Sequence, residues 1–189
     1  MKRFLSWLIE KQPVDDVSNE PFYYHNAYAD YQTAKKLILE KDLKVKDNES
    51  ALLLLDKAIN GGVRPAYGDR AFMLQLFNFD YDAISDFDKA ISFDPEDSNL
   101  FFGRGLSKMK LCDFDGAVTD LSTAVRLVKI ECERNNKLSL EAKRLGITEP
   151  IILYSSQLDF CLKRKDDFET SQGLKEFMLE KVKNTKRRL

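Results

Sequence analysis

The tetrapeptide Asp-Lys-Ala-Ile occurs twice in this chain, at residues 56–59 and again at residues 88–91. In a second set of matches, the paired residues are all separated by the same, slightly longer interval, which is the distance in sequence from residue 67 to residue 101. This set pairs Tyr67, Arg70, Ala71, Ala83, Phe87 and Ala90 with Phe101, Arg104, Gly105, Ala117, Leu121 and Ala124. Similarity at such an interval is the signature of a repeat architecture, in which each unit is one supersecondary element stacked on the next.

The apolar residues within a unit predict two helices joined by a turn. In residues 64–97 the spacing predicts a first helix from about Ala66 to Phe79, a turn near Asp80, and a second helix that ends before Pro95. Alanines along both helices allow the two helices to approach closely, and large apolar side chains fill the space around the alanines. Because one helix pair cannot bury its apolar face alone, we expect antiparallel pairs stacked in series.

These residues resemble the tetratricopeptide repeat, whose pattern is W-x2-L-G-x2-Y…A-x3-F…P. In the unit 64–97 the matching residues are Tyr67 at the Trp place, Ala71 at the Gly place, Leu74 at the Tyr place, and Ala83, Phe87, Ala90 and Pro95. The resemblance covers residues 26–130 as three repeats, at 26–63, 64–97 and 98–130. It implies an all-α solenoid of antiparallel helix pairs. The third repeat departs from the pattern at Lys108 and lacks the final Pro, so its second helix is expected to continue to about Arg134.

The segments outside the repeats have their own patterns. Residues 1–12 predict an amphipathic helix with an apolar face formed by Phe4, Leu5, Trp7, Leu8 and Ile9. We expect this face to dock on protein, either within the chain or on a neighbouring copy as a homo-oligomer. Residues 13–25 are interpreted as a linker, because they contain two prolines. Residues 131–189 predict helices that open near Pro150 and over 172–183, cap the array, and lead into a basic tail.

The inventory of reactive residues argues against catalysis and against a cofactor. His25 is the single histidine of the sequence, the three cysteines are widely spaced, and no Gly-rich phosphate loop is present. The acids between Asp80 and Asp97 lack the spacing of a calcium loop, and we expect them mainly on the solvent face of a helix. We therefore predict no metal site, no catalytic residue and a cytoplasmic protein that is not an enzyme.

The resemblance also implies where a partner binds, because ligands of this family lie along the concave surface made by the first helix of each pair. The groove residues predicted here are Tyr28, Tyr31, Phe72, Gln75, Leu76, Phe102, Leu106 and Met109. One subgroup of the family clamps the terminal carboxylate of chaperones with basic side chains. The matching places hold Tyr31, Lys35, Asp69, Asn99 and Gly103, of which only Lys35 is basic. We expect an apolar peptide or an amphipathic helix instead.

The leading hypothesis is therefore a non-catalytic adaptor that holds another protein. Two alternatives remain open at this stage. The first is a peripheral membrane or nucleic-acid scaffold that uses the basic tail and residues 1–12, although a net charge of −1 demands neither kind of partner. The second is a repeat-containing enzyme that acts on a protein.

Overall fold

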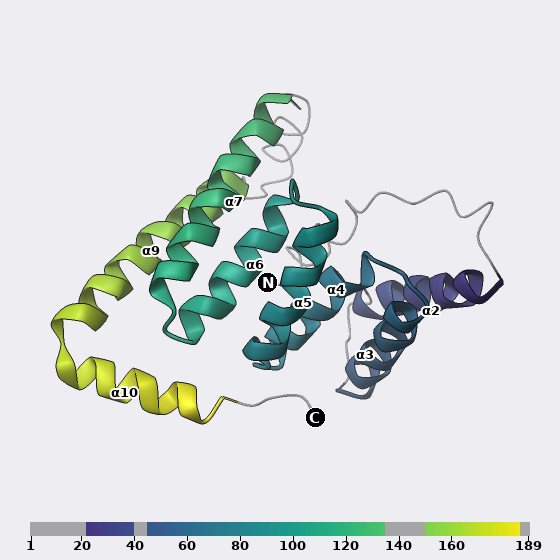
Figure 1. Ribbon diagram of the computed structural model, residues 1–189, viewed down its shortest axis with the longest axis horizontal. Coiled ribbons are helices and arrows are strands. Elements are labelled where there is room, and N and C mark those ends of the chain that lie inside the picture. Colours follow the sequence, from purple (N-terminus) through teal and green to yellow (C-terminus); the bar gives the residue numbers. More distant parts are fainter. Residues whose placement is uncertain (1–21, 40–44, 135–149, 186–189) are drawn as a thin grey trace. The chain divides into compact units, whose positions relative to one another are not determined.

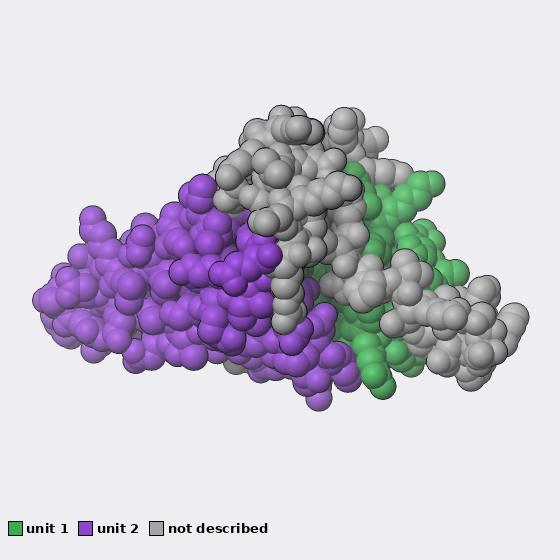
Figure 2. Space-filling view, turned by 90° about the horizontal axis from the view of Figure 1, so that it is seen from above, with its two compact units in different colours: residues 1–77 green, residues 78–189 purple. Residues whose placement is uncertain are grey.

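The computed structural model describes residues 22–39, 45–134 and 150–185, and every regular element in those ranges is an α-helix. The helices, labelled in Figure 1, are α2 (Phe22–Leu39), α3 (Val45–Asn60), α4 (Ala66–Leu76), α5 (Asp80–Phe93), α6 (Ser98–Lys110), α7 (Phe114–Arg134), α9 (Pro150–Thr170) and α10 (Gln172–Lys183). The predicted all-α class is confirmed. The chain divides into two compact units, residues 1–77 and 78–189, drawn in green and purple in Figure 2.

In the first unit, α3 packs against both α2 and α4. Small residues allow this close approach: a Cβ atom added to Gly61, just after α3, would collide with the Cβ of Ala27 on α2. The following glycine ends α3. Gly62 has φ +89°, and the amide of Val63 donates to the carbonyl of Ala58 at 3.0 Å, which closes the end of α3.

In the second unit, the helices pack in sequence, α5 on α6, α6 on α7, α7 on α9 and α9 on α10. The positions that match between the repeats form the core of this unit, and Ala83, Phe87, Ala117, Leu121 and Ala124 are fully buried. Gly105 has the same role as the small residues in the first unit, since an added Cβ would lie 2.9 Å from Cγ of Leu121. The helices are thus packed sequentially in pairs.

The turn between the two helices of a pair has the same backbone conformation in two places. Asn78 and Cys112 occupy equivalent positions of successive repeats, and their φ angles are +61° and +63°. A left-handed residue ends a helix because it turns the chain out of the right-handed path. This explains why α4 ends at Leu76 rather than at the predicted Phe79.

Most of the remaining helix boundaries agree with the predicted ones. The helix α7 continues to Arg134, and α10 spans Gln172–Lys183 with the Ser171 side chain accepting from the amide of Leu174. The helix α2 begins at Phe22, inside the predicted linker 13–25. Residues 1–12, with Phe4, Leu5, Trp7 and Leu8, lie outside the described residues. No helix in the described part of the chain is both long and apolar enough to cross a bilayer.

Candidate functional site

The predicted groove residues of the first unit lie on α2 and α4. Tyr31 and Phe72 are buried, Tyr28 and Gln75 are half-buried, and Leu76 is 40% exposed. The rings of Tyr28 and Tyr31 are tilted at 53° with their centroids 5.9 Å apart. On this unit, Leu76 is therefore the predicted apolar anchor that solvent reaches most readily.

One of the predicted groove residues of the second unit, Phe102, is covered by the chain itself. Phe102 on α6 is only 3% exposed, because its ring stacks on that of Tyr154 from α9, with centroids 4.1 Å apart and an interplanar angle of 12°. Leu106 and Met109, farther along α6, are half-buried. The structure thus brings α9 to the place where the sequence predicts a partner.

A hydrogen bond fixes this contact. The side-chain amide of Asn99 donates to Asp97, the cap of α6, at 2.8 Å, and this orients the amide oxygen of Asn99 to accept from the hydroxyl of Tyr154. Burial raises the pKa of Tyr154, and the nearby Asp97 carboxylate adds to this effect, so the phenol stays a protonated donor. The contact therefore combines aromatic stacking with a buried hydrogen bond.

The helix α9 packs on α7 and turns one line of its side chains toward the protein. Tyr154 and Cys161 are buried, and the ring of Phe168 lies 5.1 Å from that of Phe114 at the start of α7. These three residues of α9 are spaced seven apart, which is the interval that keeps one face of a helix against a partner. The sequence carried this signal, but it did not identify α7 as the partner.

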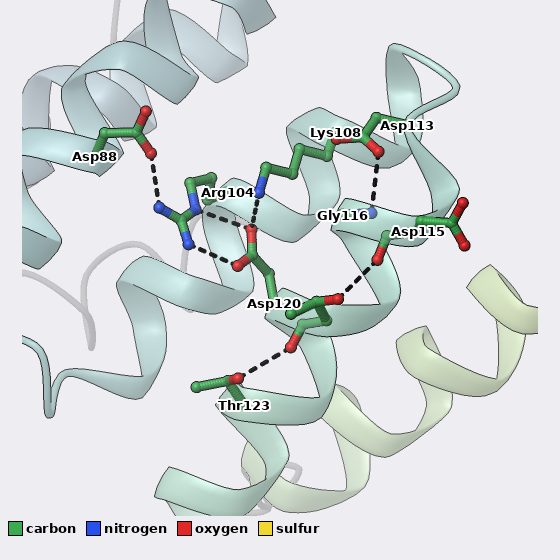
Figure 3. Close-up of polar contacts among 9 residues, drawn as sticks. Asp88, Arg104, Lys108, Asp113, Asp115, Gly116, Asp120 and Thr123 are labelled. Carbon is green, nitrogen blue, oxygen red and sulfur yellow. Dashed lines mark hydrogen bonds and ion pairs between the residues drawn. The ribbon is translucent and has the colours of Figure 1, made fainter.

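A polar cluster joins α5, α6 and α7 (Figure 3). The guanidinium of Arg104 donates to both carboxylate oxygens of Asp120, at 2.8 and 2.7 Å, and to Asp88 at 2.6 Å, while Lys108 pairs with Asp120 at 2.8 Å. The hydrogen bond to Asp120 is the main cause that raises the pKa of Arg104. Because two cations balance two carboxylates, this cluster is suited to holding helices rather than to proton transfer.

Part of this cluster recurs in the first unit. Arg70 on α4 donates to Asp56 on α3 at 2.8 Å, as Arg104 on α6 does to Asp88 on α5. Both aspartates open the tetrapeptide Asp-Lys-Ala-Ile, and the two arginines are equivalent in the repeat alignment. Each arginine also lies over the aromatic ring three residues before it, at 5.8 Å in the first unit and 5.5 Å in the second. Sequence comparison found the matching residues but not these contacts.

Two of the acids expected on the solvent face are buried. Asp86 is 5% exposed, because it shares the core stripe of α5 with Ala83, Phe87 and Ala90 at helical spacing. Asp80 is 2% exposed and opens α5, where the helix dipole favours a carboxylate. It accepts from Ser107 at 2.9 Å and pairs with Lys110 at 3.3 Å. The assignment of these two acids to solvent was wrong.

Within the described ranges, no group of three or more His, Cys, Asp or Glu side chains is placed to hold a metal ion. No family model matches the chain, and no curated protein matches its sequence at a significant level.

Proposed function

We propose that the protein is a non-catalytic interaction adaptor, built as a solenoid like that of the tetratricopeptide repeat, which holds an apolar peptide or an amphipathic helix of another cytoplasmic protein. Support for the repeat comes from contacts that recur with the sequence interval. These are the arginine pairs Asp56–Arg70 and Asp88–Arg104, and the left-handed turns at Asn78 and Cys112.

The observation that carries the binding proposal is the contact between Tyr154 and α6. There the first helix of a pair already holds another helix, through the stacked ring of Phe102 and the amide of Asn99. This is the helix-in-groove mode of recognition, with an internal segment as the occupant. The first helix of a pair can thus supply both an apolar and a polar contact to a helical ligand.

The same contact narrows the place where an external partner would bind. Since α9 covers Phe102, the most accessible of the predicted groove residues is Leu76 in the first unit, where Tyr28 and Gln75 are half-buried. Leu76 is the apolar anchor of this set, and Gln75 beside it is a hydrogen-bond donor and acceptor. A partner of mixed apolar and polar character fits these side chains better than a purely charged one.

Selection from a library of random peptides displayed on phage, each long enough to form a helix of about 12–15 residues, tests this proposal with the full-length chain immobilised. We expect enrichment of amphipathic apolar sequences whose binding is lost in Leu76→Asp. Leu53→Asp is the matched control, because Leu53 is 56% exposed on α3 but is not a predicted groove residue. Equal binding by the two variants would contradict the proposed site. Binding only to anionic vesicles or oligonucleotides, lost at high salt, would favour the scaffold alternative.

A further inference from the structure

We infer that α10 is a self-association surface, which pairs with α10 of a second copy in antiparallel orientation. This inference is independent of the proposed groove. The helix α10 is attached to the rest of the chain by few buried contacts. Met178 is the one buried residue of this helix, and it accepts a long contact from Arg164 of α9 at 3.8 Å. On either side of it, Phe177 is 55% exposed and Leu179 is 40% exposed.

The outward side of α10 carries a regular stripe of side chains. Gln172, Glu176, Leu179 and Lys183 are spaced by four, three and four residues and so share one face of the helix. Gln172 donates to Glu176 at 2.8 Å, which confirms that these two side chains lie side by side. An open hollow of about 520 Å³ borders this stripe, and its lining includes Glu176, Leu179, Glu180, Lys183 and Asn184. The hollow thus lies along the outward face of α10.

The order of charges along the stripe selects the partner and its direction. Glu176 lies on one side of Leu179 and Lys183 on the other. When a second copy is placed antiparallel about a twofold axis near Leu179, each Glu176 faces the Lys183 of the other copy, and the two leucines meet at the axis. A parallel arrangement would oppose like charges. The charges of Glu176 and Lys183 are thus complementary in the antiparallel orientation only.

The wider charge balance allows two copies to approach. From Pro150 to Lys183 the chain carries six basic and six acidic residues. The α9–α10 segments of two copies therefore have no net charge with which to repel each other. A single helix pair of this length buries little area, so we expect a weak dimer with a Kd of about 10–100 µM.

Sedimentation velocity of the full-length chain, at roughly 5 to 500 µM, tests the inference over the range where such a dimer dissociates. We expect concentration-dependent dimerisation by the wild type. Glu176→Lys and Lys183→Glu should each weaken it about tenfold, because symmetry makes each reversal act twice. The double variant Glu176→Lys/Lys183→Glu should dimerise like the wild type, and an equal mixture of the two single variants should form the mixed dimer.

The control is Lys163→Glu, which makes the same reversal at an exposed position of α9. Circular dichroism of each variant establishes that the helices are intact. A wild type that stays monomeric over the whole range overturns the inference, and this is the result expected if residues 1–12 or another protein cover the face. A double variant that remains as weak as the single ones, or a control that weakens dimerisation equally, also overturns it.

Discussion

The phenol ring of Tyr154 lies nearly parallel to the ring of Phe102, which is far from it in the sequence, and both side chains are buried. One helix of the C-terminal hairpin is thereby attached to the first helix of the third pair. The hydrogen bond from Tyr154 to Asn99 is the specific part of this attachment, because stacking alone would accept any aromatic residue.

Replacement Tyr154→Phe should therefore keep the stacking and lose the hydrogen bond. The amide oxygen of Asn99 would stay buried without its donor, at a cost of about 1–2 kcal/mol. For a chain of this size we expect the Tm to fall by roughly 2–6 °C in differential scanning calorimetry. Ser156→Ala, on the exposed side of α9, should change the Tm little. Equal effects of the two substitutions would show that the hydrogen bond contributes nothing.

The core of the second unit should not tolerate a larger side chain at Ala117. This residue is fully buried, and its carbonyl lies 3.3 Å from where a Cβ on Gly105 would be. Ala117→Leu should overpack the contact between α6 and α7 and cost roughly 1–3 kcal/mol of unfolding free energy. Urea denaturation measures this cost. An unchanged midpoint would show that Ala117 does not lie at the closest approach of these helices.

Two glycines should respond oppositely to the same substitution. Gly61→Ala would place a methyl group against the Cβ of Ala27, so α2 and α3 must separate, and we expect a loss of about 2–3 kcal/mol. Gly173→Ala meets no atom within 4 Å and removes a poor helix former from α10, so we expect a gain of up to about 1 kcal/mol. Thermal melts of both variants decide the signs. Destabilisation by both would indicate that backbone conformation, rather than contact, governs these positions.

The two carboxylates that hold Arg104 should contribute unequally. Asp120 is buried and accepts two hydrogen bonds from the guanidinium, whereas the side chain of Asp88 is largely exposed. Asp120→Asn leaves a partly buried cation without its main partner and should cost about 2–4 kcal/mol. Asp88→Asn should cost less than about 1 kcal/mol, since solvent screens an exposed pair. Urea denaturation of both variants in one buffer tests this order, and a reversed order would assign the helix contact to Asp88.

The thiol of Cys161 should report on the attachment of α9. It is fully buried, and burial is the main cause that raises its pKa. A raised pKa means less thiolate at neutral pH, so labelling by a disulfide reagent should be slow in the native protein and rise as pH increases. In a variant with Cys112 and Cys132 replaced by Ser, the reaction should accelerate strongly in Tyr154→Phe. Rapid labelling of the native protein at neutral pH would contradict the burial of this face.

The repeat interval predicted the helix pairs because the same local packing requires the same residue types at matching positions of each repeat. The small residues Ala83, Ala117 and Gly105 were identified in this way, and all three are buried. Gly105 lies where α6 and α7 approach closely. The start of α9 near Pro150 and the extension of α7 to Arg134 followed from helix start and stop signals.

The coverage of Phe102 could not be predicted, because α9 lies outside the repeats and its contact with α6 has no counterpart in another unit. The burial of Asp86 was missed for a different reason. Its charge suggested solvent, whereas its position beside Phe87 on the helix places it in the core stripe. The residue type gives only an average preference for solvent or core, whereas helical spacing decides where an individual side chain lies.

The arginine pairs have a consequence for how such a chain can change length. Residues 64–97 contain Arg70, which meets the aspartate of the preceding segment, and Asp88, which meets the arginine of the following one. The segment thus supplies the arginine for the contact with the preceding segment and the aspartate for the contact with the following one. A tandem duplication of this segment would set a copied Arg70 opposite the original Asp88, and its deletion would leave Asp56 opposite Arg104. Duplication of the segment would therefore lengthen the protein, and deletion would shorten it, with the same arginine–aspartate pair at each junction.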